Sequence, residues 1–172
     1  MKRLEGNVTI ITGGGKGIGF GMATAFAREG SNLVLTGRNM ERLQQAQQKL
    51  ESEWGIKVLP IVADGSDENA VKMVVAKTIE TFGKINTLIN NAQVSKSGLP
   101  LIQHTREDLD MAVLSGIYAT FFYMRECFPY LKESGGSVIN FASGAGLYGK
   151  PGQSSYAAAK EGIRGLSRVA AT

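Results

Sequence analysis

Short apolar segments rich in β-branched residues alternate with segments of helical periodicity, and this alternation constrains the fold most strongly. We predict strands at residues 8–12, 32–36, 57–63, 87–91 and 137–142. We predict helices at residues 17–29, 40–54, 67–82 and 106–132, with a further helix beginning near Ser155. Strands that alternate with helices form parallel sheets, which are buried on both faces. The pattern therefore predicts an α/β fold with one domain over residues 1–172.

The end of the sequence lies inside a predicted helix. Apolar residues keep helical spacing at Ile163, Leu166 and Val169, and no Gly or Pro terminator follows before Thr172. A β–α chain that stops there leaves its fifth strand at the edge of the sheet, where backbone groups are unpaired. We expect the sequence to be the front part of a longer chain, with the last strands of the sheet missing.

A glycine-rich stretch, "IITGGGKGIGFG", follows the first predicted strand and opens the first predicted helix. Such a turn suits anions, because backbone N–H groups and the helix N-terminus point at the ligand. A P-loop needs Ser or Thr directly after Gly-Lys to bind magnesium, whereas Lys16 is followed by Gly17. The P-loop interpretation therefore fails.

The dinucleotide fingerprint G-x-G-x-x-G also fails, because its last glycine would fall on Ile18 or Phe20. The spacing that fits is T-G-x-x-x-G-x-G, from Thr12 to Gly19. By itself this spacing indicates either a nucleotide-binding loop or a plain glycine-rich turn.

Charge and cysteine content limit the function classes. The net charge is +4, and the basic and acidic residues are interspersed, which favours an anionic cofactor over nucleic acid or a membrane. The single cysteine, Cys127, lies in an apolar helical stretch, which indicates a buried thiol and a reducing, cytoplasmic location. We see no metal-ligand pattern, and we predict that His104, in a polar loop, lies on the surface.

A second constellation lies downstream, in "INFASGAGLYGKPGQSSYAAAK". Ser143 follows the fifth predicted strand, and Tyr156 and Lys160 are four residues apart on one helix face. A phenol needs a pKa about three units lower, roughly 4 kcal/mol, to act as an acid near neutral pH. An ammonium about 5 Å away at an effective dielectric near 20 supplies on the order of 3 kcal/mol. The alternative is a solvated Tyr–Lys pair without function.

Taken together, the motifs resemble the short-chain dehydrogenase/reductase family, including its 3-oxoacyl-carrier-protein reductase-like members. The shared motifs are "TGGGKGIG", "NNA" at residues 90–92, Ser143 and "YAAAK", in family order over the whole chain. The resemblance implies a Rossmann-type, doubly wound parallel sheet with a nicotinamide cofactor across the carboxyl ends of its strands. It also implies reduction of a ketone or an acyl thioester by hydride transfer.

The resemblance assigns a role to each site residue. Tyr156 would donate a proton to the carbonyl oxygen, Ser143 would polarise that carbonyl, and Lys160 would bind the ribose and lower the pKa of Tyr156. The implied cofactor-binding residues, besides Tyr156 and Lys160, are Thr12, Gly13, Gly15, Lys16, Gly17, Ile18, Gly19, Arg38, Asp64, Asn91 and Ala92.

We predict NADPH as the cofactor. An NAD enzyme needs an acid after the second strand to bind the ribose 2′-OH, and the sequence there is Thr36-Gly37-Arg38. Arg38 and Lys16 can instead bind a 2′-phosphate.

Three positions depart from the family pattern. Gln93 replaces the glycine that usually follows "NNA", Gly116 stands where the family has a catalytic Asn, and Gly65 follows Asp64 in place of a bulky apolar residue. Two alternatives therefore stay open: an enoyl- or dienoyl-thioester reductase of the same superfamily, and a catalytically impaired dinucleotide-binding protein.

The fourth predicted helix is apolar on more than one side, which exceeds what one sheet-facing stripe needs. A surplus apolar face usually meets a partner, and family members commonly pair this helix and the next across a two-fold axis. We therefore predict a homodimer or homotetramer. The apolar residues are Met111, Val113, Leu114, Ile117, Tyr118, Phe121, Phe122 and Phe128.

Overall fold

A five-stranded parallel sheet forms the centre of the molecule in a computed structural model that describes residues 2–172. Its strand order is β3-β2-β1-β4-β5. The strands are β1 (Val8–Thr12), β2 (Asn32–Gly37), β3 (Val58–Val62), β4 (Thr87–Asn90) and β5 (Ser137–Asn140). The order reverses between β1 and β4, and in such sheets ligands bind at this reversal, outside the carboxyl ends of the strands. The arrangement confirms the predicted Rossmann-type fold.

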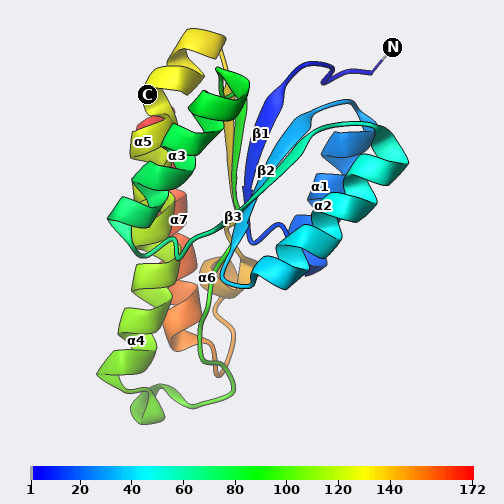
Figure 1. Cartoon of the computed structure of the whole chain (residues 1–172). Helices are drawn as coiled ribbons and strands as arrows, with labels where there is room; N and C mark the ends of the chain where they lie inside the picture. The colour runs from blue at the N-terminus through cyan, green and yellow to red at the C-terminus, as the bar shows by residue number, and fades with distance from the viewer. Residues whose placement is uncertain (1) are drawn as a thin grey trace.

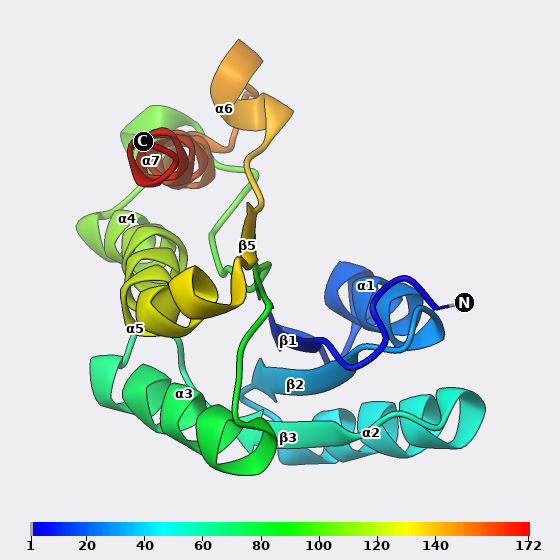
Figure 2. The same ribbon diagram turned by 90° about the horizontal axis from the view of Figure 1, so that it is seen from above.

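Helices cover both faces of this sheet (Figures 1 and 2). One face carries α1 and α2, and the other carries α3, the α4–α5 segment and α7. The bounds are α1 (Gly17–Arg28), α2 (Met40–Trp54), α3 (Glu68–Phe82), α4 (Arg106–Ala112), α5 (Ala119–Ser134), α6 (Gly144–Tyr148) and α7 (Ser154–Ala170). A 3₁₀ turn, η1 (Leu101–Gln103), precedes α4, and a π-helical turn, η2 (Val113–Tyr118), joins α4 to α5. No helix of residues 2–172 has both the length and the apolar character to cross a bilayer.

The core has one layer on each side of the sheet, and the alternation of side chains along β1 supplies both. Val8 and Ile10 pack with residues of α3 and α5, whereas Ile11 packs with residues of α1 and α2. Cys127 lies in the first layer, fully buried, and burial raises the pKa of its thiol to about 12. The expectation of a buried thiol is therefore confirmed.

The edge strand β5 is more exposed than the other strands. Val138 and Ile139 are each 39% exposed, and among residues 2–172 the strand pairs with β4 alone. A largely apolar groove of about 1050 Å³ lies beside it, between α5 and α7. Its apolar lining includes Phe128, Leu131, Val138, Ile139 and Leu166. The predicted position of the fifth strand at the sheet edge is confirmed.

Several predicted element bounds were wrong. The helix predicted at residues 106–132 is interrupted by η2 and continues to Ser134. The third and fifth strands are shorter than predicted, and α6 was not predicted at all. Five residues that include two glycines carry too little periodicity to reveal such a helix.

Candidate active site

The glycine-rich turn between β1 and α1 is tightly packed. Gly13 has a φ of 68°, which favours glycine, and its N–H donates to the Thr36 carbonyl at 2.8 Å. A Cβ on Gly19 would lie 2.2 Å from the Gly13 carbonyl oxygen. Only glycine at position 19 lets the first turn of α1 approach the loop this closely.

The same turn is joined to the end of β4 through Thr12. The Thr12 hydroxyl oxygen accepts hydrogen bonds from the Asn91 and Ala92 backbone N–H groups, both at 3.0 Å. The Asn91 side-chain amide donates to the Thr12 carbonyl at 2.9 Å. The structure thus brings together two groups of predicted cofactor residues that lie about eighty positions apart in the sequence.

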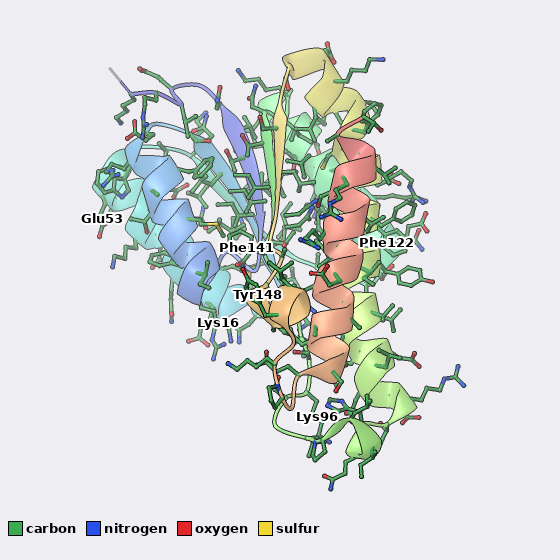
Figure 3. The ribbon with its side chains drawn as sticks, turned by 180° about the vertical axis from the view of Figure 1, so that it is seen from behind. Lys16, Glu53, Lys96, Phe122, Phe141 and Tyr148 are labelled. Carbon is green, nitrogen blue, oxygen red and sulfur yellow. The ribbon has the colours of Figure 1, made fainter. Side chains whose placement is uncertain are left out.

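The N-terminus of α1 is open to solvent and electropositive. Lys16 occupies the N-cap position without a side-chain capping bond, and the first turn contains no acidic residue. Lys16, Gly17 and Ile18 are exposed, and Figure 3 shows Lys16 at the start of this helix. The first N–H groups of a helix have no intrahelical acceptor, and the helix dipole favours a negative charge there. This end of α1 therefore suits a phosphate.

Arg38 and Asp64 follow β2 and β3, and both are exposed. The Asp64 carboxylate accepts from the Ser66 backbone N–H at 2.9 Å and from the Ser66 hydroxyl at 2.7 Å. These hydrogen bonds, with a smaller effect of the Arg38 charge, lower the pKa of Asp64. Gly65 packs on α5, because a Cβ there would lie 3.0 Å from the Ala119 Cβ.

Lys160 is the most distinctive side chain of the second constellation. It is only 4% exposed, and its Nζ donates a hydrogen bond of 2.6 Å to the Phe141 carbonyl, just after β5. Desolvation lowers the pKa of Lys160 to about 8. The Nζ lies 5.6 Å from the centre of the Tyr156 ring. The structure therefore brings Tyr156 and Lys160 together, as their spacing predicts.

Ser143 lies at the N-cap of α6, two residues after Phe141, whose carbonyl accepts from Lys160. Its hydroxyl oxygen accepts from the Ala145 N–H at 3.1 Å, which leaves the hydroxyl hydrogen free to donate. Within residues 2–172 no hydrogen bond joins Ser143 to Tyr156. Figure 3 shows Phe141, Tyr148 and Lys16 in the central part of the view, with Lys96 nearer the lower end of the molecule.

Other features of the site were not predicted from the sequence. The side chain of Gln93 turns toward Gly116 in η2, and the Ser115 hydroxyl bonds the Val94 backbone. His104, which we predicted to lie on the surface, is half-buried, and both of its ring nitrogens are inaccessible to solvent. Polar neighbours in the sequence indicate a loop, but they do not show which side of the loop packs inward. No cluster of three His, Cys, Asp or Glu side chains in residues 2–172 could hold a metal ion.

Known proteins are similar in sequence to this chain over almost its whole length. A 12alpha-hydroxysteroid dehydrogenase from Clostridium sp. is 62% identical, over 100% of this chain and 69% of that protein. A 3-oxoacyl-[acyl-carrier-protein] reductase from Thermotoga maritima is 35% identical, over 97% of this chain and 68% of that protein.

Solved structures agree closely in fold. NAD+-bound xylitol dehydrogenase superposes with a TM-score of 0.93 at 28% identity, over 98% of this chain and 65% of that one. L-sorbose reductase from Gluconobacter frateurii, complexed with NADPH and L-sorbose, gives a TM-score of 0.93 at 27% identity, over 98% and 65%. The chain thus spans about two thirds of the length of these proteins. The family model of the short chain dehydrogenases matches residues 7–172, and the chain belongs to this family.

Proposed function

We propose that this chain carries the cofactor site and the catalytic groups of an NADPH-dependent carbonyl reductase. The observation that carries the proposal is the buried Lys160 ammonium, held on the Phe141 carbonyl and adjacent to the Tyr156 ring. Burying a charge is costly, and such an arrangement is typical of functional sites. The oxidoreductase family to which the chain belongs supports the same conclusion.

The glycine turn fits a dinucleotide. A Cβ on Gly13 would lie 3.0 Å from the Asn91 side-chain nitrogen, so a larger residue would disturb the loop after β4. The pyrophosphate would lie at the N-terminus of α1, against the backbone of the glycine turn. Gly15, Gly17, Ile18 and Gly19 would line that turn, while Thr12, Asn91 and Ala92 would hold its far side. Asp64 would reach the adenine.

The chemistry divides between cofactor and protein. A dihydronicotinamide bound at this site would supply the hydride. The Tyr156 phenol donates its proton to the carbonyl oxygen, and the Ser143 hydroxyl donates a hydrogen bond to that oxygen as negative charge develops. Lys160, when protonated, would stabilise the phenolate that remains and would donate to the ribose hydroxyls of the cofactor. Tyr156→Phe should therefore lower turnover more than a hundredfold and leave NADPH affinity nearly unchanged, whereas Lys160→Ala should impair both.

In this proposal the protein distinguishes NADPH from NADH by binding the 2′-phosphate that only NADPH carries. The residue that follows Gly37 at the end of β2 is Arg38 and not an acid, and Arg38 and Lys16 are exposed cations near the carboxyl end of the sheet. Fluorescence titration of both cofactors tests the point, with tighter binding of NADPH expected. Equal or tighter binding of NADH would contradict it.

A ketosteroid is the first substrate to test, because the 62% identical relative is a hydroxysteroid dehydrogenase. The second candidate is a 3-oxoacyl thioester, on the strength of the 35% identical reductase. Oxidation of NADPH should be followed at 340 nm with a 12-oxosteroid, a 3-oxoacyl thioester, an enoyl thioester and a simple cyclic ketone. Turnover of the enoyl thioester alone would favour the enoyl reductase alternative. NADPH binding without turnover of any compound would favour a catalytically impaired dinucleotide-binding protein.

A further inference from the structure

The Gln93 side chain buries an amide that has no partner in the protein. Its Oε1 and Nε2 are both inaccessible to solvent, and neither forms a hydrogen bond with residues 2–172. A primary amide offers two donors and an acceptor with two lone pairs, and leaving such groups unpaired inside a protein costs about 1–3 kcal/mol. A buried amide without a structural partner calls for another explanation.

The backbone on both sides of Gln93 is fixed, so the direction of its side chain is set. Before it, the Ala92 N–H donates to the Thr12 hydroxyl at 3.0 Å. After it, the Val94 N–H donates to the Ser115 hydroxyl at 3.0 Å, and the single hydrogen of that hydroxyl is shared between the Val94 carbonyl at 2.9 Å and the Met111 carbonyl at 2.6 Å. The segment is thus tied to the dinucleotide turn at one end and to η2 at the other.

The space that receives this amide exists because residue 116 is glycine. A Cβ on Gly116 would lie 3.1 Å from both Cδ and Nε2 of Gln93, closer than side chains normally pack. The same Cβ would lie 3.4 Å from the Cβ of Ala159, the residue before Lys160. Gly116 itself is buried. The amide therefore lies where the loop after β4, the π-helical turn and the helix that carries Lys160 meet.

We propose that Gln93 is a positioning residue, whose amide, admitted by Gly116, sets the placement of α7 and Lys160 against the dinucleotide turn. The unpaired amide lowers the stability of the protein. In return, its free hydrogen-bonding groups order the junction between the loop after β4, η2 and α7 when the dinucleotide is bound. The proposal deepens the proposed function and rests on it, because Lys160 there holds the ribose.

Replacing the amide separates this role from packing. Gln93→Met keeps the length of the side chain and removes its polar atoms. Removal of an unpaired buried amide should leave the melting temperature unchanged or raise it. Affinity for NADPH should nevertheless fall about tenfold. A purely structural residue would move both quantities in the same direction, so unchanged NADPH affinity in Gln93→Met would overturn the proposal.

Exchanging the two side chains tests the pairing. Gly116→Asn alone should lower the melting temperature, on the order of 5 °C, and weaken NADPH binding, because Asn competes with Gln93 for one space. Adding Gln93→Ala should restore both quantities, since the amide then comes from position 116. The matched double variant Gln93→Ala/Gly116→Leu should restore the melting temperature but leave NADPH binding weak.

The control is Gly165→Asn, a change on α7 where a Cβ meets nothing within 4 Å. Equal effects of Gly116→Asn and Gly165→Asn, or equal NADPH affinity in the two double variants, would refute the amide-dependent pairing. If the unmodified chain binds no NADPH, the proposed function fails. The melting temperatures of the single and double Gly116→Asn variants then still decide whether positions 93 and 116 are coupled.

Discussion

Lys160 shows that one buried charged residue can indicate where a functional site lies. An ammonium that is 4% exposed and held by one carbonyl is a poor choice for stability alone. Its pKa falls from 10.5 to about 8 because desolvation disfavours the charged form. The folded protein therefore binds this proton less tightly than the unfolded chain does.

This difference predicts how stability depends on pH. Between pH 8 and 10.5 the unfolded chain retains the Lys160 proton more often than the folded protein, so stability should rise with pH across that window. The shift of about 2.5 units corresponds to a destabilisation of about 3 kcal/mol below pH 8. Lys160→Met should be more stable than the unmodified protein at pH 7, and the difference should shrink by about 2 kcal/mol by pH 10. Denaturant unfolding at several pH values measures it. A constant difference would show that Lys160 titrates normally.

At the scale of elements, the strand–turn–helix unit β1–α1 depends on close packing between the glycine turn and the first turn of α1. The turn leaves no room for a side chain at Gly19, whereas a Cβ on Gly21, one half turn further along α1, meets nothing within 4 Å. The two glycines therefore provide a matched pair of sites in one helix.

Gly19→Ala should destabilise the fold by about 1–3 kcal/mol, because the turn and α1 must separate. It should also abolish detectable NADPH binding. Gly21→Ala should stabilise the protein by about 0.5–1 kcal/mol and leave binding intact, since Ala is the better helix former. Thermal unfolding and NADPH titration of both variants provide the comparison. Similar behaviour of the two variants would contradict the tight packing at Gly19.

The strands and long helices could be predicted because each carries its own period of apolar residues. The π-helical turn could not be predicted, because its apolar spacing resembles that of an ordinary helix. The pairing of Tyr156 with Lys160 follows from a spacing of four along one helix. The contact between Gln93 and Gly116 joins positions 23 residues apart on different elements. Neither a glutamine nor a glycine in the sequence predicts such a contact. The partial burial of His104 could not be predicted either, because polar neighbours do not show which side of a loop packs inward.

At the scale of the whole molecule, α4, η2 and α5 expose a stripe of apolar side chains. Met111, Leu114, Tyr118, Phe121 and Phe128 are between 41% and 61% exposed. These residues follow one another at alternating spacings of three and four positions. Arg125 occupies the one position of this series that is not apolar, and its guanidinium lies over the Phe121 ring. This period is typical of a helix–helix seam. It supports the proposal that the protein forms a homodimer or homotetramer.

Leu114→Glu should convert the assembly to monomer, because it places a charge in the middle of the stripe. Leu101→Glu makes the same change at an exposed leucine in η1, outside the stripe, and should leave the assembly intact. Sedimentation velocity at several concentrations distinguishes the species. A monomeric unmodified protein at tens of micromolar would refute an interface on this stripe.

The unpaired edge of β5 should be detectable in the rates at which the backbone amide hydrogens of this strand exchange with solvent. The Ser137 and Phe141 N–H groups donate to carbonyls of Asn86 and Asn90, toward β4. The amide of Ile139, two residues from each, points the same way, while those of Val138 and Asn140 point outward. In deuterated buffer, Val138 and Asn140 should therefore label within minutes while Ile139 resists, in an alternation of period two. Slow labelling of all three amides would mean that another strand covers this edge in solution.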